Sequence, residues 1–361
     1  MFGANVARPR SIVAISLLLA IAGARPAHAD GEDPPTVEAP VGNAPTPGSG
    51  SGSGSAEHAN VLARPPAPPE DAASPITGSS SSQAQRAAPA LYSKPVSAGV
   101  VGAVYGAVGV WAYFAWFYNR PPKPFSIDYS LFELEEYAGG ADKLGHFWAT
   151  YVLARSTTSV LVRGGWRRFP SSLVASGLSL LFFTLSEVED SFVYSFEVGD
   201  ATFNLAGAAF SVLMDNVPEV DRLLDFRVEY VPSPLYRRSF RKEGNLDLAN
   251  DYTGQSYMLA LHLDALPRVT EPTWMHWARY VDVVVGFETR HFSPIGDGGI
   301  PRQDLYAGVA INMQHVLRRL FPCNTTGRQV GEGALEVLSV PYTTLKIDVA
   351  SRQRDAAIPP P

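Results

Sequence analysis

The chain has 361 residues, of which 46% are hydrophobic and 18% are charged, and its formal net charge at pH 7 is -6. This negative balance argues against a protein that binds nucleic acid through its phosphates, so we expect no nucleic-acid partner. Because Cys323 is the only cysteine, the sequence excludes an intrachain disulfide bond and a zinc site built from cysteines.

Residues 1–29 have the pattern of a secretory signal peptide. Arg8 and Arg10 precede an apolar run that is short for a membrane span, and the segment ends in the Ala-x-Ala motif "AHA". We expect cleavage after Ala29, and an uncleaved anchor is the alternative. No cysteine follows the apolar run, so this chain lacks the residue that is acylated in a bacterial lipoprotein. The expected location is the periplasm or an envelope membrane of a Gram-negative bacterium.

Residues 30–90 are rich in Pro, Gly, Ser and Ala and contain few large apolar residues. Such a segment cannot bury enough surface to offset its loss of conformational entropy. We therefore predict a disordered linker between the export signal and a folded region.

The composition changes abruptly at residues 96–118, "VSAGVVGAVYGAVGVWAYFAWFY". This segment carries no charge and is long enough to cross a bilayer. Small residues recur at every fourth position and aromatic residues gather at its end, as in membrane helices. The pattern favours contact with a membrane, and a buried core helix of a soluble bundle is the alternative.

Helical patterns follow a polar connection, and we predict three helices at about 141–162, 171–190 and 200–217. After Pro218 the apolar period changes to two in four segments: "SYMLALHLDAL", "RYVDVVVGFETRH", "DLYAGVAINMQ" and "TTLKIDVA". This alternation predicts half-buried strands in an antiparallel meander.

The predicted fold class is therefore α+β. A membrane-associated bundle of about four helices occupies residues 91–218, and a small antiparallel sheet within residues 219–350 packs on it. Residues 351–361 are predicted to be a disordered tail.

Each of the three predicted helices has a polar turn near one of its ends. An acid near a helix N-terminus is favoured by the unpaired N–H groups, so Asp142 and Asp200 could be helix caps. The acids of "SEVED" lie at a C-terminus, where they oppose the helix dipole and need a cationic partner, solvent or a site. An antiparallel arrangement would bring these turns together in one cluster, made of Asp142, Lys143, His146, Glu187, Asp190, Asp200 and Asn204.

Two interpretations of this cluster stay open. In the first, it is a hydrogen-bonded pin that fixes the packing of the helices. In the second, it is catalytic: His146 acts as acid, base or ligand, the carboxylates assist it, and Lys143 stabilises an anion. No cofactor is predicted, although a carboxylate-rich cluster with one histidine could hold a divalent metal ion.

The segments "ADKLGHFWATY", "SEVEDSF" with "GDATFNLAGAAF", and "DFRVEYVPSPLY" resemble the YfiM-like family of predicted periplasmic lipoproteins, domain of unknown function 2279. With "NDYTGQSYMLALHLDAL" and "VVVGFETRHF", the resemblance covers about residues 110–315. Over a shorter stretch, the "DK..H" and "D...N..G" patterns also resemble those of VanZ-like membrane proteins. The missing lipidation cysteine departs from the lipoprotein pattern and makes residues 96–118 the expected membrane contact.

The resemblance implies an envelope location and brings no established reaction. It also implies two groups of recurring residues. The first is the cluster together with Gly207. The second lies at the junction between the helices and the strands and consists of Arg227, Tyr230, Asp251, Tyr252, Gly254 and Gln255. From the residues alone, "DYTGQSY" is typical of a turn before a strand, and Arg227 could pair with Asp225 or reach Asp251. The histidines beyond residue 250 show no ligand spacing, so no metal is assigned to them.

We favour a cell-envelope protein that is associated with a membrane and has a structural or envelope-maintenance role. Its expected partners are membrane lipids or envelope proteins. The alternative is a hydrolase or transferase that acts on a lipid or lipid-linked substrate through the Asp/His/Glu cluster. Convergence of the cluster on an opening would favour the enzyme, and a sealed, fully hydrogen-bonded cluster would favour the structural role.

Overall fold

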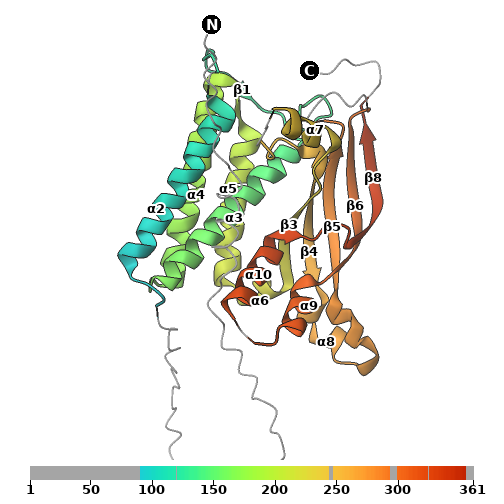
Figure 1. Cartoon of the computed structure of the whole chain (residues 1–361). Helices are drawn as coiled ribbons and strands as arrows, with labels where there is room; N and C mark the ends of the chain where they lie inside the picture. The colour runs from blue at the N-terminus through green and yellow to red at the C-terminus, as the bar shows by residue number, and fades with distance from the viewer. Residues whose placement is uncertain (1–89, 119, 244–246, 293–298, 324, 355–361) are drawn as a thin grey trace, which may run out of the picture. The chain divides into compact units, whose positions relative to one another are not determined.

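The computed structural model describes residues 90–118, 120–243, 247–292, 299–323 and 325–354 (Figure 1). The predicted signal peptide, all but the last residue of the predicted linker, and residues 355–361 lie outside this part of the chain. The described residues combine long helices with a six-stranded sheet, so the predicted α+β class is confirmed.

Four long helices come first: α2 (Lys94–Ala112), α3 (Ala141–Arg163), α4 (Arg168–Val193) and α5 (Val198–Asn216). A π-helical turn, η1 (Tyr113–Phe117), continues α2. Helix α3 packs against α2, α4 and α5 (Figure 1). Its closest approach to α5 depends on Gly207, where a Cβ atom would lie 2.3 Å from the carbonyl oxygen of Phe147. A two-residue parallel pair, β1 (Ile127–Asp128) with β2 (Phe196–Glu197), joins the loops that precede α3 and α5.

The main sheet follows in the order β7-β3-β4-β5-β6-β8. Its strands are β3 (Leu224–Tyr230), β4 (Gln255–His262), β5 (Val281–Arg290), β6 (Arg302–Ile311), β7 (Leu338–Ser339) and β8 (Thr344–Gln353). Neighbours from β3 to β8 are antiparallel, whereas β7 is parallel to β3, so the sheet is mixed. Strand β8 ends at Gln353 and therefore enters the predicted tail.

Several helices interrupt this half of the chain, where the sequence pattern predicts strands alone. They are α6 (Pro218–Leu223), α7 (Pro234–Glu243), α8 (Pro267–Thr270), α9 (Met313–Leu320) and α10 (Thr326–Val337), with short 3-10 turns η2 (Tyr252–Gly254), η3 (Leu263–Ala265) and η4 (Thr273–Tyr280). Helix α10 packs on α9 and β3 and leads into β7.

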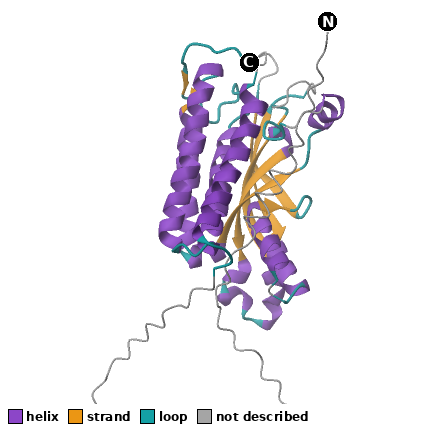
Figure 2. Ribbon diagram, turned by 60° about the vertical axis from the view of Figure 1, so that its left-hand side comes forward, coloured by secondary structure: helices purple, strands orange, loops and turns teal. Residues whose placement is uncertain are grey.

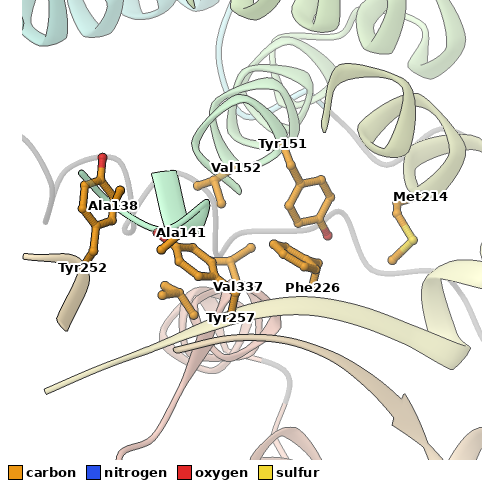
Figure 3. Packing of buried hydrophobic residues seen from close by; sticks show 10 residues of the cluster. Ala138, Ala141, Tyr151, Val152, Met214, Phe226, Tyr252, Tyr257 and Val337 are labelled. Atoms are coloured by element: carbon orange, nitrogen blue, oxygen red, sulfur yellow. The ribbon is translucent and has the colours of Figure 1, made fainter. Parts of the chain in front are cut away.

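The main hydrophobic core lies between α3 and the sheet (Figure 3). Tyr151 and Val152 of α3 face Phe226 of β3 and Tyr257 of β4. The indole N–H of Trp148 donates to the carbonyl oxygen of Val337 at 2.8 Å, which fastens α3 to the end of α10. This layer fixes the helices that carry the polar cluster against one side of the sheet (Figure 2).

The two sides of the sheet have an unexpected polarity. Beyond the part that α3 covers, the side facing α3 exposes large apolar residues, which are Leu259, Val283, Val285, Leu305, Val309, Ile311, Leu345, Ile347 and Val349, each 40–75% exposed. The opposite side buries polar residues, including Asp225, Arg227, His262, Asp282 and Glu288. Lys346 of β8 reaches Glu229 of β3 at 3.8 Å, so the sheet curls over this polar side. The predicted alternation is present, but the large apolar residues of β5, β6 and β8 are exposed on the side facing α3. The opposite side buries a small apolar cluster (Met258, Ala260, Val284, Tyr306 and Ala310) together with the polar residues.

Helix α4 also exposes large apolar residues. Its buried side carries small or polar residues, which are Ser171, Ser172, Ala175, Ser176, Ser179, Glu187 and Ser191, together with Phe183 and Val193. Its other side exposes Phe169, Leu173, Val174, Leu178, Leu181, Leu185, Val188 and Phe192, each 38–59% exposed. The small inward residues let neighbouring helices come close, and Ser179 donates its hydroxyl to the Thr150 carbonyl of α3 at 3.0 Å.

Candidate functional site

Lys143 lies at the centre of a group of carboxylates. Its Nζ atom is 2.7 Å from Glu136, 2.8 Å from Asp142 and 3.1 Å from Asp200, and it also contacts Glu197 at short range. The side chain is completely buried. Its path runs past Gly199, where a Cβ atom would lie 2.7 Å from Cε of the lysine. The loop before α3, the first turn of α3 and the start of α5 are therefore joined through one ammonium group.

His146 lies one turn further along α3 and faces the other two helices. Its Nδ1 atom is 3.3 Å from Oε1 of Glu187 on α4 and 3.3 Å from Oδ1 of Asn204 on α5. Its Nε2 atom is 3.3 Å from Oδ2 of Asp200 on α5. The Asn204 oxygen also accepts a hydrogen bond from the Thr150 hydroxyl at 2.7 Å. The three predicted polar turns therefore meet around the imidazole.

Burial differs between the imidazole and its partners. The His146 side chain is 24% exposed, whereas those of Glu187 and Asp200 are 1% and 5% exposed. The cluster is therefore reached from outside on the histidine side, while its carboxylates lie inside the bundle.

The electrostatics follow from burial and crowding of like charge. Burial raises the pKa of Glu136 to about 8 and that of Asp200 to about 7, and the nearby Asp142 carboxylate adds to both shifts. Burial also lowers the pKa of His146, which favours a neutral imidazole. Burial opposes the charge of Lys143, but the surrounding carboxylates outweigh it and raise the pKa, so the ammonium stays charged.

Some polar atoms of the cluster are buried without a hydrogen bond among the described residues. They include Oε1 of Glu187, Nδ2 of Asn204 and Oε2 of Glu136. Nδ1 of His146 lies 3.3 Å from Glu187 Oε1 but does not have the geometry of a hydrogen bond to it. Two sets of side chains bring their ligand atoms within 4.8 Å of one another, as a metal site requires: His146 with Glu187 and Asp200, and Glu136 with Asp142 and Glu197.

The structure brings together six of the seven cluster residues predicted from sequence through direct contacts. The seventh, Asp190, lies one turn beyond Glu187, and its charge interacts with that of His146. Asp200 could be a helix cap by its sequence position, but Glu197 is the N-cap residue of α5, and Asp200 lies in the first turn, where its side chain contacts Lys143 and His146. Glu136 and Glu197 were missed. Glu136 lies in the connection before α3, and Glu197 precedes Asp200 by three residues.

The junction residues form separate contacts. Arg227 pairs with Asp225 at 2.7 Å and with Asp282 at 2.9 Å, so of its two predicted partners it meets Asp225 and not Asp251. Asp251 instead accepts hydrogen bonds from the Tyr230 hydroxyl at 3.1 Å and the Ser233 N–H at 2.8 Å.

The remaining junction residues stabilise the turn before β4. The Gln255 amide donates to the carbonyl oxygens of Leu248 and Ala249 at 3.1 and 3.0 Å. The hydroxyls of Tyr252 and Tyr137 lie 3.4 Å apart. Gly254 has no room for a side chain, because a Cβ atom would lie 2.6 Å from the Val231 carbonyl oxygen.

A family model described as predicted periplasmic lipoprotein, domain of unknown function 2279, matches residues 128–216. The resemblance found in the sequence is confirmed over this segment, which contains all seven residues of the cluster and also Glu136 and Glu197. The match agrees with an exported protein located in the periplasm or cell envelope. Neither the search of curated proteins nor the search of solved structures gives a match.

Proposed function

We propose that the protein is a membrane-associated structural component of the cell envelope. Its apolar outer surfaces contact lipid acyl chains, and its polar cluster holds the helices together. The observation that carries this proposal is the polarity of one side of α4 and of the sheet side facing α3, where many large apolar residues are exposed while serines and charged residues are buried behind them.

Helix α4 supports lipid contact by its length as well as its polarity. Helices α2 and α4 are both long and apolar enough to cross a membrane. A core helix of a soluble protein would be mostly buried. In the most apolar 18-residue stretch of each helix, only 22% of α2 and 33% of α4 are buried. The exposed leucines of α4 therefore call for an apolar environment outside the protein.

The sheet supports the same environment independently of the helices. An antiparallel sheet with one side in water normally exposes polar residues on that side. Here Leu345 and Ile347 of β8 are 75% and 74% exposed, while Lys346 between them points to the buried side and contacts Glu288 at 3.0 Å. Lipid acyl chains would solvate these exposed apolar side chains better than water.

Flotation with phosphatidylcholine vesicles tests the proposal. We expect the purified chain, freed of detergent in the presence of vesicles, to float with the lipid. Leu181→Lys on α4 and Ile347→Lys on β8 should each weaken flotation, whereas Glu219→Lys, at an exposed polar position of α6, should not. Equal flotation of all four proteins, or no flotation of the wild type, would contradict lipid contact through these surfaces.

A hydrolase or transferase acting on a lipid or lipid-linked substrate is the second candidate. The observation in its favour is the exposed edge of His146 beside two buried carboxylates, where the imidazole could act as a base. Lys143 suits this role less well than the sequence suggested, because four carboxylates already surround its ammonium group.

Replacement of His146 by Ala and of Glu187 by Gln separates the two functions. Folded protein in the envelope with an altered lipid composition would favour chemistry. Loss of folded protein in proportion to any lipid change would favour the structural role.

A further inference from the structure

The chain contains a second histidine that lies between two carboxylates, His262, and its N···O distances can be compared with those of His146. Nε2 of His262 lies 2.9 Å from Asp225, and Nδ1 lies 2.8 Å from Asp282. These are the lengths of charge-assisted hydrogen bonds, which run from about 2.7 to 2.9 Å. His262 of β4 therefore acts as a buried cation that joins β3 and β5 to its own strand.

His146 has the same kind of neighbours but a different geometry. Its two nitrogens lie 3.3 Å from Glu187 and 3.3 Å from Asp200. At this separation the imidazole does not satisfy Glu187, whose Oε1 atom is buried with no hydrogen-bond partner in the part of the chain that the structure describes. A buried, unpartnered carboxylate oxygen is costly, so a further positive group is expected between these side chains.

We propose that His146, Glu187 and Asp200 bind one divalent transition-metal ion, with one ligand from each of α3, α4 and α5. Two ligand atoms held about 2.1 Å from a tetrahedral ion are separated by about 3.4 Å, which matches the spacing of Nε2 of His146 and Oδ2 of Asp200. Nδ1 of His146 lies 3.3 Å from Oδ1 of Asn204 and 3.3 Å from Oε1 of Glu187, and a hydrogen bond from Nδ1 to Asn204 leaves Nε2 free to bind the metal. Glu187 is within reach of the same ion, because the ligand atoms of all three side chains lie within 4.8 Å of one another.

Only one of the two candidate sets needs an ion. The set of Glu136, Asp142 and Glu197 already surrounds the ammonium group of Lys143, which supplies its positive charge. One nitrogen and two carboxylate ligands suit Zn²⁺ or Mn²⁺ better than Mg²⁺ or Ca²⁺, which favour oxygen ligands alone. The His146 side chain is 24% exposed, so a water molecule from outside could complete the coordination.

Titration of the detergent-solubilised full chain with Zn²⁺ after removal of metals by a chelator tests the site. All proteins carry Cys323→Ser, because this exposed thiol could bind zinc by itself. We expect one tight equivalent per chain and at least tenfold weaker binding in Glu187→Gln and in His146→Asn. The matched controls Glu219→Gln and His276→Asn, both at exposed positions, should bind as the parent does.

Absence of a tight equivalent in the parent protein would overturn the proposal, as would unchanged binding in Glu187→Gln or equal loss in the two controls. Melting temperatures show whether the variants are folded. Without metal, the parent and Glu187→Gln should both melt cooperatively. Zinc should raise the melting temperature of the parent but not that of Glu187→Gln. If Glu187→Gln does not fold, Asp200→Asn takes its place with the same expected loss of zinc binding. Because no vesicle enters this experiment, its failure is distinct from failure of the proposed lipid contact.

Discussion

Lys143 of α3 lies 3.1 Å from Asp200 of α5, and the same ammonium group reaches the loop before α3 through Glu136 at 2.7 Å. The loop before α3, the first turn of α3 and the start of α5 thus depend on a single charge. Replacing one side of a buried ion pair leaves the other charge without compensation, which costs far more than the pair itself contributes.

Lys143→Met is therefore expected to lower the free energy of unfolding by about 3–5 kcal/mol, measured by chemical denaturation in detergent. Arg318→Met is the control, because this arginine also pairs with carboxylates but its side chain is 45% exposed. Its expected cost is about 1 kcal/mol or less. Equal destabilisation by the two substitutions would contradict the role of Lys143 as the central pin.

The His262 pair predicts a dependence of stability on alkaline pH. Burial opposes the charge of His262, but Asp225 and Asp282 outweigh it and raise its pKa from 6.5 to about 10. The folded state therefore binds a proton that the unfolded state releases above pH 6.5. The stabilisation is complete below pH 6.5 and is lost as the pH rises towards 10.

Melting temperatures measured from pH 6 to pH 10 should fall for the wild type and fall less steeply for His262→Asn. The variant should also melt at a lower temperature at pH 6, where the wild-type imidazole is charged. Parallel curves for the two proteins would show that His262 is not held as a cation.

Gly207 predicts a steric effect at the contact between α3 and α5. A Cβ atom there would lie 2.3 Å from the Phe147 carbonyl oxygen, so Gly207→Ala should destabilise the protein by about 1–3 kcal/mol. At Gly177 of α4 nothing lies within 4 Å of an added Cβ, so Gly177→Ala should be neutral or stabilise the helix by up to about 1 kcal/mol. Thermal melting of both variants measures the contrast, and similar effects at the two positions would contradict the close packing of α3 on α5.

Much of the helical half could be predicted from sequence, because its apolar runs are long and its polar residues are few. The helix ends were placed within three residues, and the cluster around His146 was anticipated from one polar turn per helix. Glu136 could not be found in this way. Glu136 belongs to an irregular connection with no helix or strand period, and only the packing of the folded chain brings its carboxylate to Lys143.

The sheet shows a different limit of sequence patterns. Alternation separated Leu345 and Ile347 from Lys346, but a period of two does not say which side is buried. That choice depends on the curl that brings Lys346 to Glu229 and on what surrounds the molecule. Strand β3 escaped prediction because Asp225, Arg227 and Glu229 make it appear exposed, although all three are buried.

Spin labels in phospholipid vesicles test the lipid contact of the exposed apolar residues most directly. In a Cys323→Ser background, single cysteines at Leu185 on α4, Ile347 on β8 and Glu219 on α6 each carry a nitroxide. We expect labels at positions 185 and 347 to be relaxed by oxygen, which concentrates in lipid, and shielded from a water-soluble nickel complex, with the reverse at position 219. Strong relaxation by the nickel complex at all three positions would show that these apolar surfaces face water and would contradict the proposed membrane association.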